Sequence, residues 1–327
     1  MAKQAGRRWT ENMKPKKPLI SVIIPHLNQP DGLEACLSSL YSQTLERSAF
    51  EVIVVDNGST SLPRAVVERY PGTLLLQELK PGPGPARNRG AEAASAEIFA
   101  FTDSDCRAHP DWLNQALRTL QSAPQRTILG GDVQIWREPN TAITALEAYE
   151  SVFAYRFKLY IEQHGFCGTG NLVVRRSDFD NIGPFRGIDV AEDIEWGQSA
   201  RAAGYTFRYV SGMIVFHPAR QSLRELLVKW DRHIQHAVNA GSRNATWQAR
   251  WVFRALAVLL SPVVDWSKVI ASDRIHGVLP RVKAIIVLIA VRWYRAYKMV
   301  FLLMSRRQVR WNRDLAVINS DVHNDVP

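Results

Sequence analysis

Two aspartates one residue apart, Asp103 and Asp105, have the spacing to hold a divalent cation. They follow an apolar run at 98–102 that predicts a buried strand, so both carboxylates are expected at its carboxyl end. Open α/β sheets bind their ligands at that edge. Two hard oxygen donors one residue apart suit a divalent cation, and a cation held there can also hold a diphosphate. An ordinary polar turn is the alternative, and the pair alone leaves it open.

A second aspartate pair, Asp178 and Asp180, stands in a different context. Ser177 precedes it, and serine followed by acidic residues is typical of the start of a helix. We therefore predict a helix start here and a metal site only at the first pair.

Alternating strands and helices over the first hundred residues must position these groups. Apolar runs at 19–25, 51–56, 73–77 and 98–102 predict strands, and the segments between them predict helices. The alternation predicts an α/β fold with a doubly wound, mostly parallel sheet flanked by helices. Asp31 is predicted to cap the first helix.

Further elements are predicted beyond residue 110, from the same periodicities. They are helices at 111–122, 142–163 and after 189, strands at 128–136, 172–174 and 213–217, and a C-terminal helical extension with helices at 222–241, 247–270 and 278–307.

Polar side chains follow three of the predicted strands at the point where each strand ends. They are His26 and Asn28, Asp56 and Asn57, and Asp103 and Asp105. Because the carboxyl ends of parallel strands meet at one edge of a sheet, we expect these groups to share one crevice.

Composition and simple motifs exclude several classes of protein. The three cysteines lack the spacing of a zinc site or a disulfide framework, which favours a reducing, cytosolic compartment. The basic N-terminus has no apolar h-region, so no secretory signal is expected. The glycines at 82 and 84 begin a dinucleotide fingerprint, but Arg87 stands at its sixth position, which argues against a dehydrogenase.

Positive charge is concentrated at the two ends of the chain. The net charge is +10; residues 221–327 hold 17 Lys/Arg against 7 Asp/Glu, residues 1–17 hold six against one, and residues 18–220 hold 18 against 23. Basic ends favour contact with an anionic partner, either membrane headgroups or nucleic acid. No nucleic-acid-binding motif is present, so we do not expect nucleic acid. Simple solubility is the remaining alternative.

Aromatic and cationic residues alternate in the C-terminal region, as at 250–251 and 292–295. Such residues favour the headgroup layer, and no segment reaches the roughly 20 apolar residues that span a bilayer. We predict peripheral contact with an anionic membrane; a helical appendage packed on the catalytic body is the alternative. The predicted domains are a disordered basic tail (1–17), a catalytic domain (18–220) and this helical region (221–327).

Several short motifs occur in one order along the chain. They lie at 21–25, 54–59, 85–90, 103–105, 168–176, 182–185 and 192–195. The ordered set resembles the family 2 glycosyltransferases with the GT-A fold, over about residues 18–218. The resemblance implies inverting, metal-dependent transfer of a sugar from a nucleotide-diphosphate donor, most often a uridine diphosphate sugar, to a saccharide or lipid-linked acceptor.

The resemblance also implies a role for each matching residue. On the donor side, the main chain of Pro25, His26 and Leu27 would line the nucleoside pocket, Asp56 would bind the base, and Arg87 and Asn88 would lie near the nucleotide. Asp103 would face the ribose or sugar and the metal, and Asp105 and His217 would hold Mn²⁺ or Mg²⁺. Asp193 would be the general base, and the acceptor side would contain Gly170, Asn171 and Glu192.

Each assignment has a structural alternative. The alternative to Asp193 as the base is an ordinary helix start, because Asp189 and Glu192 have the spacing of a capping box. The alternative to base binding by Asp56 is a turn, for which Asp56 before Gly58 is typical. Arg87 could be a solvated helix residue and His217 a structural one. A nucleotidyltransferase or a catalytically silent scaffold would be the alternatives for the whole chain. The first would need a glycine-rich, basic loop after the first strand, which is absent here.

Two departures from the family pattern lie on the expected acceptor side. Ser199 replaces an arginine six residues after Asp193, and Arg186 and Gly187 replace acidic residues. These two departures leave the identity of the acceptor undetermined. The Gln-x-x-Arg-Trp motif of processive synthases is absent, so a single addition is favoured. We expect glycan assembly on the cytoplasmic face of the inner membrane.

Overall fold

The computed structural model describes residues 17–187, 191–239 and 245–304. The chain divides into two compact units. Unit 1 comprises residues 1–141 and 153–219, and unit 2 comprises residues 142–152 and 220–327. The predicted domain limits stay a prediction; the observed units differ from them in placing 142–152 with the C-terminal helices.

Unit 1 is built on one eight-stranded sheet in the order β3-β2-β1-β4-β7-β6-β8-β5. The first four strands are mutually parallel where they pair, as are β6 and β8, whereas β7 is antiparallel to both β4 and β6. The predicted mostly parallel sheet is thus confirmed. The strands are β1 (Ile20–His26), β2 (Phe50–Asp56), β3 (Thr73–Gln77), β4 (Ile98–Thr102), β5 (Arg107–Ala108), β6 (Thr127–Trp136), β7 (Asn171–Arg175) and β8 (Thr206–Pro218).

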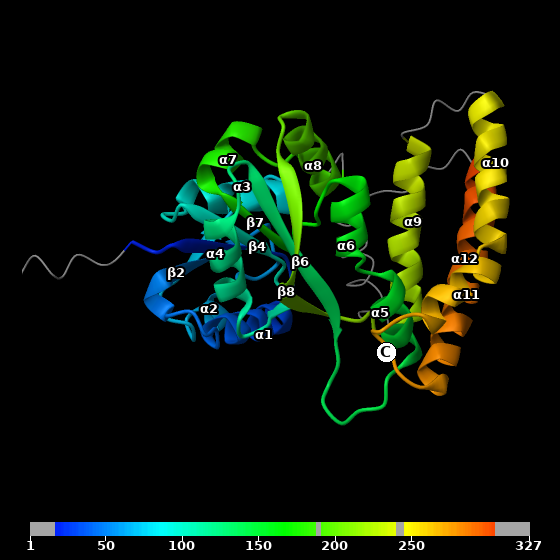
Figure 1. Cartoon of the computed structure of the whole chain (residues 1–327), viewed down its shortest axis with the longest axis horizontal. Coiled ribbons are helices and arrows are strands. Elements are labelled where there is room, and N and C mark those ends of the chain that lie inside the picture. The colour runs from blue at the N-terminus through cyan, green and yellow to red at the C-terminus, as the bar shows by residue number, and fades with distance from the viewer. Residues whose placement is uncertain (1–16, 188–190, 240–244, 305–327) are drawn as a thin grey trace, which may run out of the picture. The chain divides into compact units, whose positions relative to one another are not determined.

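Helices flank this sheet, as Figure 1 shows for unit 1. Helix α3 packs on β1 and β2, and α4 packs on β6 and β8. The helices of unit 1 are α1 (Pro30–Tyr41), α2 (Arg64–Val67), α3 (Pro83–Ala93), α4 (Trp112–Ser122), α6 (Phe157–Leu159), which continues as a π-helical turn (Tyr160–His164), α7 (Arg176–Ile182) and α8 (Glu192–Ala202).

The core of unit 1 lies on both faces of the central strands. All seven residues of β1 are buried, as are five consecutive residues of β2 from Val52. Continuous apolar runs, rather than alternating ones, are what a parallel sheet covered on both faces requires. In the register, Ile24 pairs with Val54 and His26 pairs with Asp56. The two strands therefore end side by side, which brings their last polar residues together.

Helix starts are where the local predictions differ from the structure. The cap of α1 is Gln29, not Asp31, because Pro30 occupies the first helical position, for which its fixed φ and missing N–H are suited. Helix α8 begins at Glu192 with Ala191 as its N-cap, so the capping-box alternative is wrong; Asp189 lies outside the described residues. Helix α7 confirms the helix predicted around Asp178.

The helix predicted at 142–163 is not continuous. Helix α5 (Ala145–Phe153) ends where the chain passes from unit 2 to unit 1, and α6 begins four residues later. Unit 2 otherwise consists of α9 (Leu223–Asn239), α10 (Ala245–Leu260), α11 (Pro262–Ile270) and α12 (Val278–Met304). The predicted helix at 247–270 breaks at Pro262, which cannot continue the hydrogen-bond ladder of α10.

One apolar cluster of unit 2 joins α9, α10 and α12. It contains Ile234, Val238, Trp251, Ala255 and Met299, and the indole N–H of Trp251 donates to the Met299 carbonyl at 2.9 Å. Helix α12 packs against both α9 and α10 (Figure 1). Within the described ranges, no helix combines the length and the apolar character needed to cross a membrane.

Candidate active site

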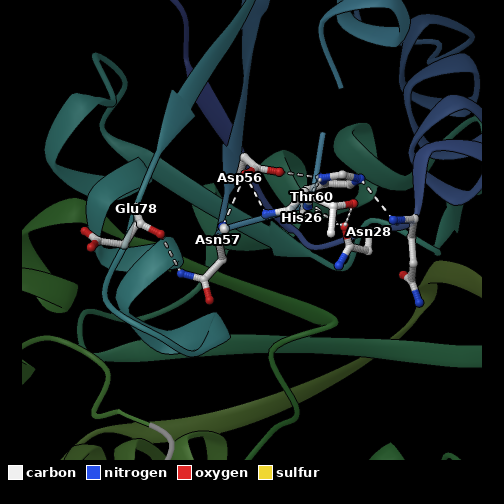
Figure 2. Close-up of polar contacts among 9 residues, drawn as sticks. His26, Asn28, Asp56, Asn57, Thr60 and Glu78 are labelled. Carbon is white, nitrogen blue, oxygen red and sulfur yellow. Dashed lines mark hydrogen bonds and ion pairs between the residues drawn. The ribbon is translucent and has the colours of Figure 1, made fainter. Parts of the chain in front are cut away.

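A buried hydrogen bond joins the ends of β1 and β2 (Figure 2). His26 Nδ1 lies 3.0 Å from Asp56 Oδ1, and both side chains are at most 1% exposed. The N–H of Gln29 donates to His26 Nε2 at 3.3 Å, which assigns the imidazole proton to Nδ1 and the donor role to His26. The second oxygen of Asp56 accepts the N–H groups of Gly58 and Ser59 at 3.2 and 3.0 Å.

These hydrogen bonds set the charge of Asp56. Burial acts to raise the pKa of its carboxyl, but hydrogen bonds from Ser59 and His26 favour the ionised form, and the pKa is lowered from its ordinary value of 3.8. Asp56 is therefore a fixed negative charge, and both of its oxygens are used within the protein.

Two asparagines tie together the loops that follow the first three strands (Figure 2). The N–H of Asn28 donates to Ser59 Oγ, and Asn28 Oδ1 accepts the N–H of Thr60, both at 2.9 Å. Asn57 Nδ2 donates to the carbonyl of Glu78 at 2.9 Å. Asn28 has a φ of +51°, a left-handed conformation that asparagine adopts more readily than most residues.

A pocket of about 370 Å³ opens between the loops after β1 and β2. Of the three residues predicted to line a nucleoside pocket, His26 lines this one, whereas Pro25 is buried within β1 and Leu27 is 43% exposed. The other lining residues are Asn28, Pro30, Thr60, Ser61, Leu62, Pro63, Ala65 and Val66.

The two carboxylates that follow β4 each meet a basic side chain of unit 1. Asp103 Oδ1 lies 2.6 Å from Arg87 Nη2, and Asp105 Oδ2 lies 3.2 Å from Nε2 of His217, which is near the end of β8. Ligand atoms of Asp103, Asp105 and Cys106 all lie within 4.8 Å of one another. This is the single acidic cluster of metal-ligating type within the described part of the chain, and Asp178 and Asp180 are not part of one.

The donor set of this cluster suits a hard divalent cation. Carboxylate oxygens and an imidazole nitrogen are ligands for Mn²⁺ and, for the oxygens, Mg²⁺. Burial, together with the two aspartates, raises the pKa of the Cys106 thiol well above its ordinary value of 9.0, so its sulfur stays protonated and is a poor ligand. Burial acts to lower the pKa of His217, but Asp105 outweighs it and the pKa is raised.

Arg87 links the candidate metal ligands to helix α8. Its guanidinium pairs with Asp103 and, through Nη1, with Glu192 Oε1 at 3.2 Å. The side chain is only 3% exposed, which excludes the solvated helix residue that the sequence left as an alternative. A Cβ atom at Gly170 would lie 2.8 Å from Asp103 Oδ2, so glycine at this position leaves room for the carboxylate in its observed place.

Asp193 follows Glu192 in the first turn of α8 and is half-buried. Burial, reinforced by the charge of Glu192, raises the pKa of its carboxyl to about 6. Arg87 and the N–H of Ile194 act in the opposite direction. A carboxylate with a pKa near the working pH is a suitable proton acceptor.

Two predicted site residues use their side chains to hold backbone. The amide of Asn88 exchanges two hydrogen bonds with the N–H and carbonyl of Phe185, at 2.9 and 2.8 Å. Asn171 is fully buried; its Nδ2 donates to the carbonyls of Asp132 and Met213, and its Oδ1 accepts the indole N–H of Trp112, all at 2.8 Å. Asn88 thus anchors the loop that follows α7, and Asn171 ties the start of β7 to β6, β8 and α4.

A family model described as "Glycosyl transferase family 2" matches residues 21–189, just over half of the chain. The chain belongs to glycosyltransferase family 2. The resemblance drawn from the ordered motifs is confirmed, and the chain is a glycosyltransferase rather than a nucleotidyltransferase or a silent scaffold.

Named relatives of this family 2 glycosyltransferase agree with the assignment. The chain is 34% identical to glycosyltransferase AglE of Haloferax volcanii over 218 residues, 65% of this chain and 70% of AglE. It is 37% identical to the validoxylamine A glucosyltransferase of Streptomyces hygroscopicus subsp. jinggangensis over 119 residues, 35% of this chain but only 28% of that protein.

A solved structure shows the fold of this glycosyltransferase. The mannosyltransferase PcManGT from Pyrobaculum calidifontis, in complex with GDP-Man and Mn²⁺, aligns with a TM-score of 0.55 at 18% identity. The alignment covers 93% of this chain and 94% of that one. The predicted GT-A fold is confirmed.

The direct side-chain pairings of the site were not predicted, although the resemblance had assigned Asp105 and His217 to one metal ion. The sequence placed His26 and Asp56 at one edge of the glycosyltransferase sheet, but their pairing depends on β1 and β2 being neighbours in register. The Asp105–His217 and Arg87–Glu192 pairs depend on contacts across 112 and 105 residues, respectively. A pairing of complementary charges at predicted strand ends would have been the available signal for the first of these.

Proposed function

We propose that this glycosyltransferase moves a sugar, from a uridine diphosphate donor, to a saccharide or lipid-linked acceptor, with inversion and with the help of Mn²⁺ or Mg²⁺. The observation that carries the proposal is the Asp103–Arg87–Glu192 bridge, because it connects the candidate metal ligands to the helix that bears Asp193. Sugar transfer needs the metal ligands, which would act on the donor, and Asp193, which would act on the acceptor, to lie in one site.

Asp103, Asp105 and His217 would hold the divalent cation. When bound, the cation would neutralise the negative charge that develops on the leaving diphosphate. The fixed positive charge of Arg87 would orient Asp103 for this task, and Gly170 would leave room for its carboxylate.

Asp193 would accept the proton of the acceptor hydroxyl. A hydroxyl is a weak nucleophile until a positioned base removes its proton, and such a base contributes a factor of about 10²–10⁴ to the rate. Attack on the anomeric carbon from the side opposite to the diphosphate inverts its configuration. NMR can compare the anomeric configuration, α or β, of the transferred sugar in the product with that in the donor. This comparison tests the predicted inversion.

The nucleoside would bind at the ends of β1 and β2, where the pocket beside His26 opens. Asp56 would contact the base, as the resemblance implies, only if one of its hydrogen bonds to His26, Gly58 or Ser59 opens. The closed network supports a second contribution of Asp56, which is to fix the loop that forms the pocket wall.

The setting we propose is polysaccharide or cell-envelope glycan assembly, with single additions, on the cytoplasmic face of the inner membrane. The basic C-terminal helices support a peripheral contact with anionic lipid, and a lipid-linked acceptor would be presented at such a surface.

Release of UDP from a panel of UDP-sugars, with and without Mn²⁺, tests the proposed donor and metal. Asp105→Ala should reduce release by about a hundredfold or more, because it removes a metal ligand. Asp180→Ala, in the second aspartate pair, should leave release unchanged. Release that survives Asp105→Ala would contradict the metal role, and loss with Asp180→Ala as well would indicate a general folding defect.

A further inference from the structure

Helices α10, α11 and α12 of unit 2 expose an unusual amount of apolar surface. Of the 23 large apolar side chains that are exposed among the described residues, 17 lie on these helices, as five, four and eight. Phe253 and Val263 are each 74% exposed. Contiguous apolar patches on this scale are rare on proteins surrounded only by water and mark a binding surface.

The exposed residues of α12 lie on one face of the helix. Val282, Ile286, Trp293, Tyr297 and Phe301 are between 45% and 61% exposed and are spaced by four or seven residues. That spacing places them in one stripe along a 27-residue helix. The stripe contains no charged residue.

The charged residues of α12 are turned toward the interior of unit 2. Arg292 pairs with the buried Asp265 at 2.7 Å, and the guanidinium of Arg295 lies 3.7 Å from the ring centroid of Trp230. Lys298 also pairs with Asp231 of α9, at 3.4 Å. Helix α12 also buries apolar residues such as Leu288 and Val291, so it is apolar on two sides, and its outer stripe is left without charged residues because these pair within unit 2.

The charge around the apolar face selects for an anionic partner. Across α10, α11 and α12 the one acidic residue is Asp265, which is buried and paired with Lys268 and Arg292. Arg250 and Arg254 of α10 are exposed. The loop between α11 and α12 carries the exposed Asp273, but the exposed charges of the three helices themselves are cations, which complement a surface of anionic headgroups.

We propose that the outer face of α10, α11 and α12 inserts into the boundary between headgroups and acyl chains of an anionic bilayer, with α12 lying in the membrane plane. Burial of the apolar stripe drives the association, and the exposed arginines select anionic lipid. The inference deepens the membrane contact of the proposed function and rests on that part alone.

The mode of binding differs from the one predicted from sequence. The segment 292–295 was expected to lie in the headgroup layer as a whole. In the structure Trp293 faces outward, whereas Arg292 and Arg295 make contacts within unit 2. Association should therefore depend on apolar insertion and resist salt.

Flotation of the full chain with mixed phosphatidylcholine and phosphatidylglycerol vesicles tests the proposal. The protein should float at about 0.1 M and at about 1 M NaCl, between which the Debye length falls from about 10 Å to about 3 Å. Ile286→Glu combined with Trp293→Glu should lower the floated fraction by about tenfold or more. The matched control is Leu79→Glu in unit 1, at a side chain that is 75% exposed, and it should float like the parent.

Three outcomes would overturn the proposal. Flotation lost at high salt would indicate electrostatic adsorption, and flotation unchanged in the double variant would place the contact elsewhere. A lipid-free dimer that the double variant dissociates, seen by light scattering, would assign the face to a second copy of the chain. Quenching of tryptophan by brominated lipid, reduced in Trp293→Phe, provides a readout that does not rely on the charged variants folding.

Flotation requires no donor, and UDP release in solution requires no membrane. Failure of the membrane inference can therefore be distinguished from failure of the proposed reaction.

Discussion

Asp193 is the residue whose charge state should control the rate. Its carboxyl has a pKa raised to about 6 and would act as a base only when ionised. We expect kcat/KM to rise with pH and to level off above about pH 6 to 7. Asp193→Asn should lower kcat by about 10²–10⁴-fold, because it removes the proton acceptor. The measurement is a pH series of sugar transfer or UDP release.

Two neighbouring glutamates provide the controls for this profile. Glu192 contributes to the raised pKa of Asp193. Glu192→Gln should therefore move the acidic limb, the low-pH range over which kcat/KM rises, to lower pH. Glu195, in the same helical turn, is not among the groups that shift this pKa, and Glu195→Gln should leave the limb in place. A flat profile between pH 5 and 7 would contradict the assignment of Asp193.

Asp56 should matter for stability as well as for binding. Its ionised form accepts hydrogen bonds from His26, Gly58 and Ser59, and Asp56→Asn replaces one acceptor oxygen by a donor. We expect the free energy of unfolding at pH 7 to fall by about 1–3 kcal/mol. Urea unfolding is the measurement, and the exposed Asp31→Asn should change it by less than about 0.5 kcal/mol.

The free energy of unfolding that is lost in Asp56→Asn should depend on pH in a defined direction. Because the pKa of Asp56 is lowered in the folded state, its contribution is present above the ordinary value of 3.8 and is lost as the pH falls through the folded-state pKa. The difference between parent and Asp56→Asn should therefore shrink in acid. An equal difference at pH 7 and pH 3 would mean that packing, not charge, explains the effect.

At the scale of elements, the approach of the loop before β7 to the residue after β4 should control the metal site. Gly170→Ala would place a Cβ atom 2.8 Å from Asp103 Oδ2 and push the carboxylate away. We expect the Mn²⁺ concentration for half-maximal activity to rise by about tenfold to a hundredfold, with little change in melting temperature.

A second glycine gives the matched control. At Gly212 of β8 an added Cβ would meet the end of the flexible Gln115 side chain at 3.0 Å, which can move. Gly212→Ala should therefore leave the Mn²⁺ dependence unchanged. Equal effects of the two substitutions would contradict the specific role of the space beside Asp103.

Strands were more predictable than their mutual contacts. The apolar runs that predicted β1, β2, β3 and β4 are local features, and each strand lies within one residue of its predicted range. The start of α1 was displaced because Pro30 outranks Asp31 as a start signal. Strand β8 extends from Thr206, well before the predicted 213, because pairing with β6 decides its length.

The site was predictable to the extent that strand ends carry it. The aspartates after β4 could be placed at that edge from the strand they follow, whereas His217 was placed beside them only through the family resemblance. The structural use of Asn88 and Asn171 could not be predicted, since their partners are backbone groups of distant segments, Phe185, Asp132 and Met213. Side-chain type and spacing do not reveal which backbone groups need a partner.

At the scale of the whole molecule, each unit has its own apolar interior. Unit 1 packs its core around the sheet, and unit 2 packs apolar side chains such as Leu288 and Val291 together with ion pairs between its helices. The sequence predicted a basic, aromatic helical region but not that its charges face inward. Amphipathic spacing defines two faces of a helix and does not state which one is covered.

The chain passes between the units three times, after residues 141, 152 and 219. Helix α5 depends on later residues of its own unit: Glu150 is paired with Arg220, and Lys283 donates to the carbonyl of Ile143 at 2.8 Å. A truncation after residue 219 would strip α5 of these partners. Such a fragment should aggregate more than the same fragment with 142–152 replaced by a glycine–serine linker, and light scattering would compare them.

If the fragment with the glycine–serine linker aggregated more, helix α5 would be stabilised by unit 1 rather than by unit 2. If the expected order holds, an ancestor could not have gained the C-terminal helices by fusion at one end alone, and a descendant could discard them cleanly only through two separate deletions.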